Sequence, residues 1–133
     1  MKPLKTLLMV ASLLFVTTLA LGQTNTQGAF QKLNYSVKGS WSLVEEDGQT
    51  YLELNETFST QSGPDLKLFV TKTNLDRLNG SNAIQDAALI SRLKRSNGIQ
   101  RYLIPEGVDL SDYATLLIHC ERFSKPWAGA KLN

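Results

Sequence analysis

The residues best suited to chemistry in this chain stand side by side at positions 119 to 122. Cys120 is the only cysteine of the 133 residues and follows the only histidine, His119. Glu121 and Arg122 come next. A neighbouring guanidinium favours a thiolate, whereas a neighbouring carboxylate opposes it. We therefore take Cys120 as the candidate redox thiol, with His119, Glu121 and Arg122 as supporting residues.

The apolar run Ala114–Cys120 is compatible with a β-strand. Side chains alternate along a strand, so Cys120 would share a face with Ile118, while His119 would lie on the opposite face. A Cys–His dyad, or a metal held by both residues, would therefore need a bulge. A position at the end of this strand favours solvent access to Cys120, with Arg122 on the same face. The competing interpretation is a buried thiol that serves as a small apolar residue.

Other catalytic and metal-binding patterns are missing from the sequence. With one cysteine and one histidine, a structural zinc site would need two carboxylate ligands, which is an uncommon set. No carboxylate pair has a spacing that marks it for acid–base work, and there is no P-loop, dinucleotide fingerprint or nucleophile elbow. The residues therefore support no metal site and no hydrolase or transferase, and a redox role is the one enzymatic class left open.

The first 22 residues read as a signal peptide. Lys2 and Lys5 precede an uncharged apolar run from Thr6 to Leu21, with small residues just before a cleavage point ahead of Gln23. The run is shorter than the roughly 20 residues that a membrane-spanning helix needs. We therefore predict no retained membrane span and a secreted, periplasmic or cell-surface protein. Such compartments favour paired cysteines, which makes a lone one informative.

The charge of the remaining chain is balanced. The sequence has 14 basic and 12 acidic residues, and removal of Lys2 and Lys5 leaves 12 of each. Proteins that bind nucleic acid usually carry a basic patch or stripe. We therefore expect no nucleic-acid partner.

The pattern after the leader predicts an all-β protein. Residues 23–32 are polar and read as a flexible lead-in, and residues 33–38 then alternate as in a half-buried strand. Asp47-Gly48 lies between two alternating runs and predicts a hairpin. The segment 87–93 fits a strand or a short helix, and Asn74–Asp86 reads as a long loop without an assigned role. Short strands separated by turn residues predict one antiparallel β-sandwich or barrel-like domain over residues 33–133.

The C-terminal third resembles the end of the electron-transfer DM-thirteen domain family. The likeness lies in Tyr113–Phe123, which contains Cys120 followed by Glu121 and Phe123, and continues through Trp127 to Leu132. Earlier landmarks of the family occur in the same order: the Gly39 turn, Leu54–Phe58 leading into Gly63-Pro64-Asp65-Leu66, the Leu93–Gly98 turn, and Gln100–Pro105. The resemblance spans residues 33–132.

This resemblance implies an extracellular all-β module of a kind often found beside DOMON domains. In the family a single cysteine is proposed to do redox work as a bare thiol or as a haem ligand, and Cys120 is the matching position. His119 stands where family members often have an aromatic residue. Thiolate-ligated haem needs a large apolar pocket, so we favour the bare thiol and predict no cofactor, with haem as the other possibility.

Two functions therefore remain open. In the first, Cys120 cycles between a thiol and an oxidised or mixed-disulfide state with an unknown redox partner, and a Cys120-linked homodimer is one variant. In the second, the domain is a non-catalytic cell-surface module that binds carbohydrate or protein. Trp41 and Trp127 would then be the binding candidates, and Cys120 would be a packing residue.

Overall fold

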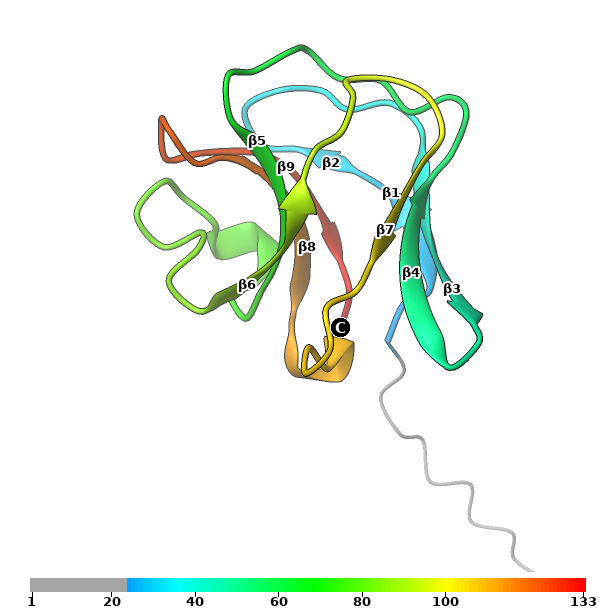
Figure 1. Ribbon diagram of the computed structural model, residues 1–133. Coiled ribbons are helices and arrows are strands. Elements are labelled where there is room, and N and C mark those ends of the chain that lie inside the picture. The colour runs from blue at the N-terminus through cyan, green and yellow to red at the C-terminus, as the bar shows by residue number, and fades with distance from the viewer. Residues whose placement is uncertain (1–23) are drawn as a thin grey trace, which may run out of the picture.

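Two antiparallel sheets face each other in the computed structural model, which describes residues 24–133 (Figure 1). The four-stranded sheet has the order β1 (Gln27–Ala29), β3 (Ser40–Glu46), β4 (Gln49–Leu54), β7 (Gln100–Leu103). The five-stranded sheet has the order β2 (Gln31–Lys32), β9 (Lys125–Lys131), β8 (Thr115–Cys120), β5 (Leu66–Thr71), β6 (Ala87–Arg92). Two short 3₁₀ turns, η1 (Leu75–Arg77) and η2 (Leu110–Asp112), complete the elements. The predicted all-β, sandwich-like fold is confirmed.

The main hydrophobic core lies between the sheets. Alternation along the strands turns one side chain in two inward, as with Leu52 and Leu54 of β4 and Leu116 and Ile118 of β8, all at most 1 % exposed. All strands and their core residues lie within residues 24–133. This part of the chain therefore contains a complete two-layer core.

The start of the domain differs from the sequence prediction. The expected flexible lead-in at residues 23–32 contains β1, which pairs with β3, and β2, which pairs with β9. Phe30 lies between them and packs in the main core. The strand predicted at residues 33–38 is wrong, because this segment forms bends and one isolated bridge at Lys38. Two short edge strands thus tie the N-terminal segment to both sheets.

The connection between β5 and β6 covers the outer face of the five-stranded sheet. Phe69 and Leu117 point to this face and form a second cluster with Ala83 of the connection. Leu78 and Ile84 of the same connection pack against the cluster. The loop Asn74–Asp86 therefore covers apolar residues of the sheet, a structural role that its polar composition does not indicate.

The predicted hairpin at Asp47-Gly48 is confirmed. Both residues have positive φ, 52° and 75°, as a two-residue turn with right-handed twist requires. The segment that could have been a strand or a helix is strand β6. No helix within residues 24–133 is long and apolar enough to cross a membrane. The predicted signal peptide, residues 1–22, lies outside the described part of the chain.

Candidate redox site around Cys120

Cys120 is the last residue of β8, and its side chain is buried in the main core. It stands opposite Leu66 of β5 on one side and Lys125 of β9 on the other. Its exposed fraction is 0 %. Of the two interpretations of this position, the structure shows the buried thiol, because residues distant in sequence close over this end of the sheet.

Trp127 of β9 is part of this cover. The β8–β9 register shifts between Ile118 and His119, so that Ile118 faces Ala128, His119 faces Pro126, and Trp127 is left as the extra residue. A bulge of this kind re-aims a side chain, and Trp127 joins the main core with 5 % of its surface exposed. The bulge predicted as the condition for a Cys–His dyad thus exists, but on the neighbouring strand.

Several contacts hold Trp127 in place. Its indole Nε1–H donates to Thr60 Oγ1 at 2.8 Å, and its ring stacks on Tyr35 with centroids 3.8 Å apart and planes at 28°. Its backbone carbonyl accepts from three consecutive N–H groups, those of residues 33–35, at 3.3, 3.1 and 3.0 Å. These contacts therefore hold the Trp127 side chain in one position in the core.

The turn Ser62–Asp65 closes over the same place. A Cβ atom on Gly63 would lie 3.0 Å from Leu66 Cδ2 and 3.3 Å from Trp127 Cη2. That spacing is tighter than ordinary van der Waals contact, so a side chain here would press on both residues. Glycine lets the turn pack directly on Leu66, which pairs with Cys120, and on Trp127 of the same core.

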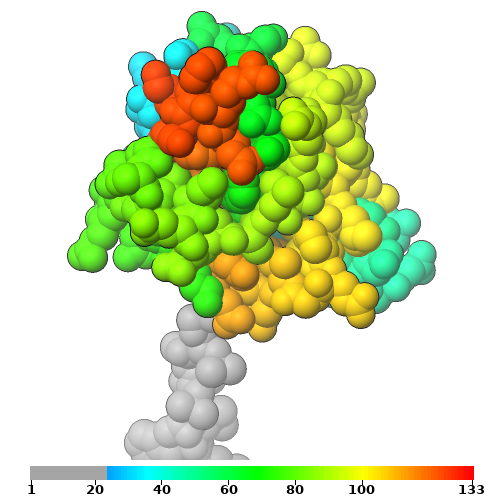
Figure 2. All heavy atoms as spheres, turned by 60° about the vertical axis from the view of Figure 1, so that its left-hand side comes forward, coloured from blue at the N-terminus to red at the C-terminus, as the bar shows by residue number. Residues whose placement is uncertain are grey.

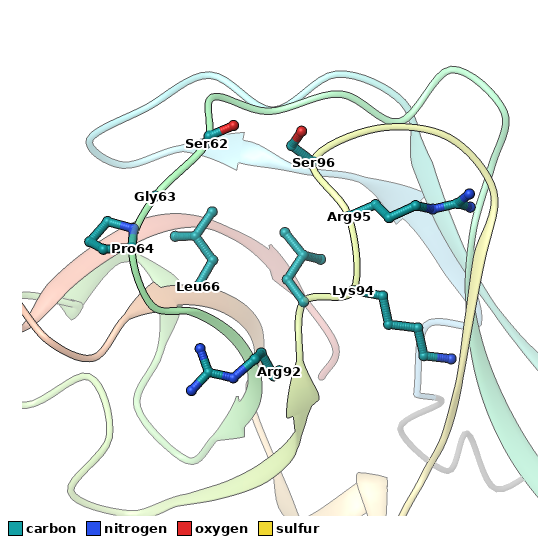
Figure 3. Close-up of a pocket in the computed structure, with 9 residues that line it drawn as sticks. Ser62, Gly63, Pro64, Leu66, Arg92, Lys94, Arg95 and Ser96 are labelled. Atoms are coloured by element: carbon teal, nitrogen blue, oxygen red, sulfur yellow. The ribbon is translucent and has the colours of Figure 1, made fainter.

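A cleft of about 210 Å³ lies between this turn and the segment after β6. Leu66 points into it, whereas Lys94 and Arg95 on its rim point away (Figure 3). Ligand pockets for molecules of drug size are about 300–1,000 Å³, and haem is at least as large as such molecules. This cleft is therefore smaller than a haem site, and Cys120 is not among the residues that line it.

His119 occupies the opposite face of the sheet, as the alternation predicts. It is 0 % exposed, and neither Nδ1 nor Nε2 has a hydrogen-bond partner. The Phe69 ring meets it edge-on at 6.0 Å. Burial lowers the pKa of His119 from its ordinary value, and Glu121 partly opposes this shift. His119 thus cannot serve Cys120 as a base, because the sheet separates them.

Glu121 and Arg122 lie beyond the end of β8. Glu121 forms an ion pair with Lys67, which also lies 3.5 Å from Asp65. This bond to Glu121 is the main reason that the pKa of Lys67 is raised. Arg122 is exposed in the turn after β8, so the predicted same-face relation to Cys120 does not hold, because strand alternation has ended.

The two tryptophans proposed as binding residues do not form a surface platform. Trp41 is 1 % exposed and Trp127 is 5 % exposed. Gly28 of β1 faces Trp41 across the sheet, and a Cβ there would lie 3.3 Å from its Nε1. Both indoles are core residues, so neither presents its ring at the surface.

Sequence reasoning missed the residues that shield the thiol. Gly63 and Leu66 belong to a landmark of the family resemblance, and no local pattern marks Tyr35 or Thr60 as contacts of Trp127. The order Gly63-Pro64-Asp65-Leu66 was the one available signal. Within residues 24–133 no group of three or more His, Cys, Asp or Glu side chains could hold a metal ion.

Comparison with known proteins identifies the family. The family model described as Electron transfer DM13 matches residues 29–132, which is most of the chain and begins inside the predicted lead-in. No curated protein matches the chain, and neither does any solved structure. The resemblance in the C-terminal third is thus part of a match over both sheets. The chain belongs to the Electron transfer DM13 family.

Proposed function

We propose that this domain is an exported electron-transfer module in which Cys120 is the redox-active group. Its family points to a redox-related role, and Cys120 is the only thiol of the chain. The observation that carries the proposal is the cover over this end of β8: Leu66 pairs with Cys120, the bulged Trp127 lies in the same core, and Gly63 lets a turn close over both.

Burial decides which redox chemistry this thiol can perform. Thiol–disulfide exchange needs a thiolate that reaches a disulfide sulfur, and a side chain with 0 % exposure cannot do so in the closed fold. We therefore infer that the Ser62–Asp65 turn and the end of β8 open locally before reaction. Local opening costs less free energy than global unfolding. The cover therefore regulates access to Cys120 while the rest of the domain stays folded.

In the open form the Cys120 thiolate attacks a disulfide of a partner molecule. One new S–S bond joins Cys120 to one partner sulfur, the partner's disulfide breaks, and its second sulfur leaves as a thiolate. Cys120 is thereby oxidised and the partner's leaving sulfur is reduced. Because the chain has no second cysteine, a thiol from another molecule must resolve the mixed disulfide. A second copy of the domain is one such molecule.

The test is the rate at which an aromatic disulfide reporter reacts with Cys120 in two core variants. Leu66→Ala removes the side chain opposite Cys120, whereas Leu52→Ala removes a buried leucine from the other sheet. We expect Leu66→Ala to react faster than Leu52→Ala under conditions where both have the same free energy of unfolding. Equal rates that track global unfolding would mean that Cys120 is only a packing residue.

Complete burial of Cys120 also favours the second candidate, a binding module without redox chemistry. In that case the binding surface is the outer face of the four-stranded sheet. Leu103 is 45 % exposed there, next to Tyr51 in register, and the Arg101 guanidinium stacks 3.9 Å from the Tyr51 ring centroid. Binding of a carbohydrate or protein ligand that survives Cys120→Ala but is lost in Leu103→Ser would support this candidate.

Export is the remaining part of the proposal, and it depends on residues 1–22. The expected product in an exporting host begins near Gln23, which the intact mass of the purified protein would reveal. A product that retains its first 22 residues would contradict cleavage.

A further inference from the structure

The turn that joins β8 to β9 exposes a phenylalanine. Residues 121–124 form this turn, and 64 % of the Phe123 surface is exposed, the highest value among the large hydrophobic residues that remain exposed in the described chain. This turn, here called the knob, projects from the five-stranded sheet in Figure 1, and in Figure 2 it (orange-red) lies at the surface beside the β5–β6 connection (green). Most of the Phe123 surface is therefore not covered by its own domain.

The knob packs against the β5–β6 connection, which holds its backbone in place. Ser124 has a positive φ of 47°, a conformation that a non-glycine residue rarely adopts. Gly80 of the β5–β6 connection lies directly behind it, because a Cβ on Gly80 would be 2.4 Å from the Ser124 carbonyl oxygen. The Asn79 carboxamide oxygen accepts from the backbone N–H groups of Ser81 and Asn82, which fixes the loop that provides this support. The position of Phe123 is therefore held by the fold.

The charge beside Phe123 is positive. Arg122 and Lys125 flank it and are exposed, and neither forms an ion pair with another residue of the described chain. The one acidic residue of the turn, Glu121, is paired with Lys67. The knob thus presents one apolar ring between two cations that have no acidic partner.

We propose that this knob is a membrane-contact site, in which Phe123 enters the interfacial region of a bilayer and Arg122 and Lys125 contact anionic lipid phosphates. A specific protein interface buries about 800 Å² on each partner around several anchors, whereas the other residues of this convex turn are charged or small. A bilayer surface accommodates a single apolar ring flanked by basic side chains. The site goes beyond the proposed redox function and does not depend on it.

Co-sedimentation with lipid vesicles tests the proposal. The protein is residues 24–133, which contain both sheets and the complete core, and circular dichroism verifies that each variant is folded. We expect binding to vesicles of phosphatidylcholine mixed with phosphatidylglycerol and much weaker binding to phosphatidylcholine alone. Phe123→Ser should lower the partition coefficient about tenfold, and Arg122→Ser or Lys125→Ser about fivefold each.

Ile99→Ser is the matched control, because Ile99 is 62 % exposed in a different loop. It should bind like the unmodified domain. The proposal is overturned if Phe123→Ser binds as well as Ile99→Ser, or if the unmodified domain does not bind anionic vesicles at low salt. Either result would assign the exposed ring to another partner.

Discussion

Cys120 and His119 are consecutive residues that lie in different hydrophobic surroundings on opposite faces of the five-stranded sheet. Cys120 belongs to the core between the sheets, whereas His119 meets Phe69 beneath the β5–β6 connection. Both are 0 % exposed. A change at one residue should therefore act on its own face, and the two positions can be tested separately.

His119 should make the stability of the domain depend on pH. Its folded-state pKa lies below its ordinary value because of burial, so below about pH 6.5 the unfolded chain binds a proton that the folded chain does not. The free energy of unfolding should fall as pH drops below that value, by up to about 1.4 kcal/mol per pH unit. The fall should end once pH passes the folded-state pKa. Above about pH 6.5 both states are neutral, and this contribution is absent.

His119→Leu should remove this pH dependence. At neutral pH the variant should be at least as stable as the unmodified domain, because it replaces a buried ring with two unpartnered nitrogens by an apolar side chain. The measurement is the urea midpoint of unfolding of both proteins across the pH range. The difference between the two midpoints removes the pH dependence that the carboxylates contribute equally to both proteins. If the urea midpoints of the two proteins change with pH in parallel, protonation of His119 does not destabilise the folded state.

Cys120 should tolerate alanine better than serine. Alanine leaves a small void, at a cost of about 1 kcal/mol, whereas serine places a hydroxyl among Leu66, Ile118 and Trp127, at about 1–3 kcal/mol if it finds no partner. The free energies of unfolding in urea provide the comparison. A serine variant as stable as the alanine variant would mean that this part of the core admits water. The same measurement decides which variant serves as the thiol-free control in redox assays.

The local sequence pattern was sufficient where neighbours in sequence are neighbours in space. Alternation placed Cys120 and His119 on opposite faces, and Asp47-Gly48 located the β3–β4 hairpin, because both depend on a few adjacent residues. Strands β1 and β2 were missed because each is only two or three residues long. Their pairing partners, β3 and β9, lie elsewhere in the chain, so composition alone gave no signal.

The environment of the candidate site depends on contacts across long sequence distances. The strand end was the argument for solvent access to Cys120, yet Leu66 pairs with it from 54 residues away, which is the difference between 120 and 66. His119 is hidden under residues of the β5–β6 connection whose polar composition suggested a free loop. Periodicity identifies the face of a side chain, but what covers that face is decided by tertiary packing.

Gly39 and Gly48 should respond differently to alanine. Both have positive φ, 88° and 75°, so each substitution should cost about 1–2 kcal/mol of conformational strain. A Cβ on Gly39 would also lie 2.5 Å from the Phe58 backbone nitrogen, whereas a Cβ on Gly48 meets nothing within 4 Å. Gly39→Ala should therefore lose about 1–3 kcal/mol more than Gly48→Ala. Equal thermal midpoints for the two variants would contradict the close approach at Gly39.

Thr60→Val should loosen the cover over the thiol. Valine keeps the shape of threonine but removes the oxygen that accepts the Trp127 indole N–H at 2.8 Å. A donor left without a partner at a residue only 5 % exposed should cost about 1–3 kcal/mol. Thr57→Val is the control, because the Thr57 hydroxyl bonds to the Asn55 side chain at an exposed site. Because Trp127 packs in the same core as Cys120, alkylation of the folded protein should be faster in Thr60→Val than in Thr57→Val. If Thr60→Val is destabilised while its alkylation rate stays unchanged, Trp127 stabilises the core without controlling access to the sulfur.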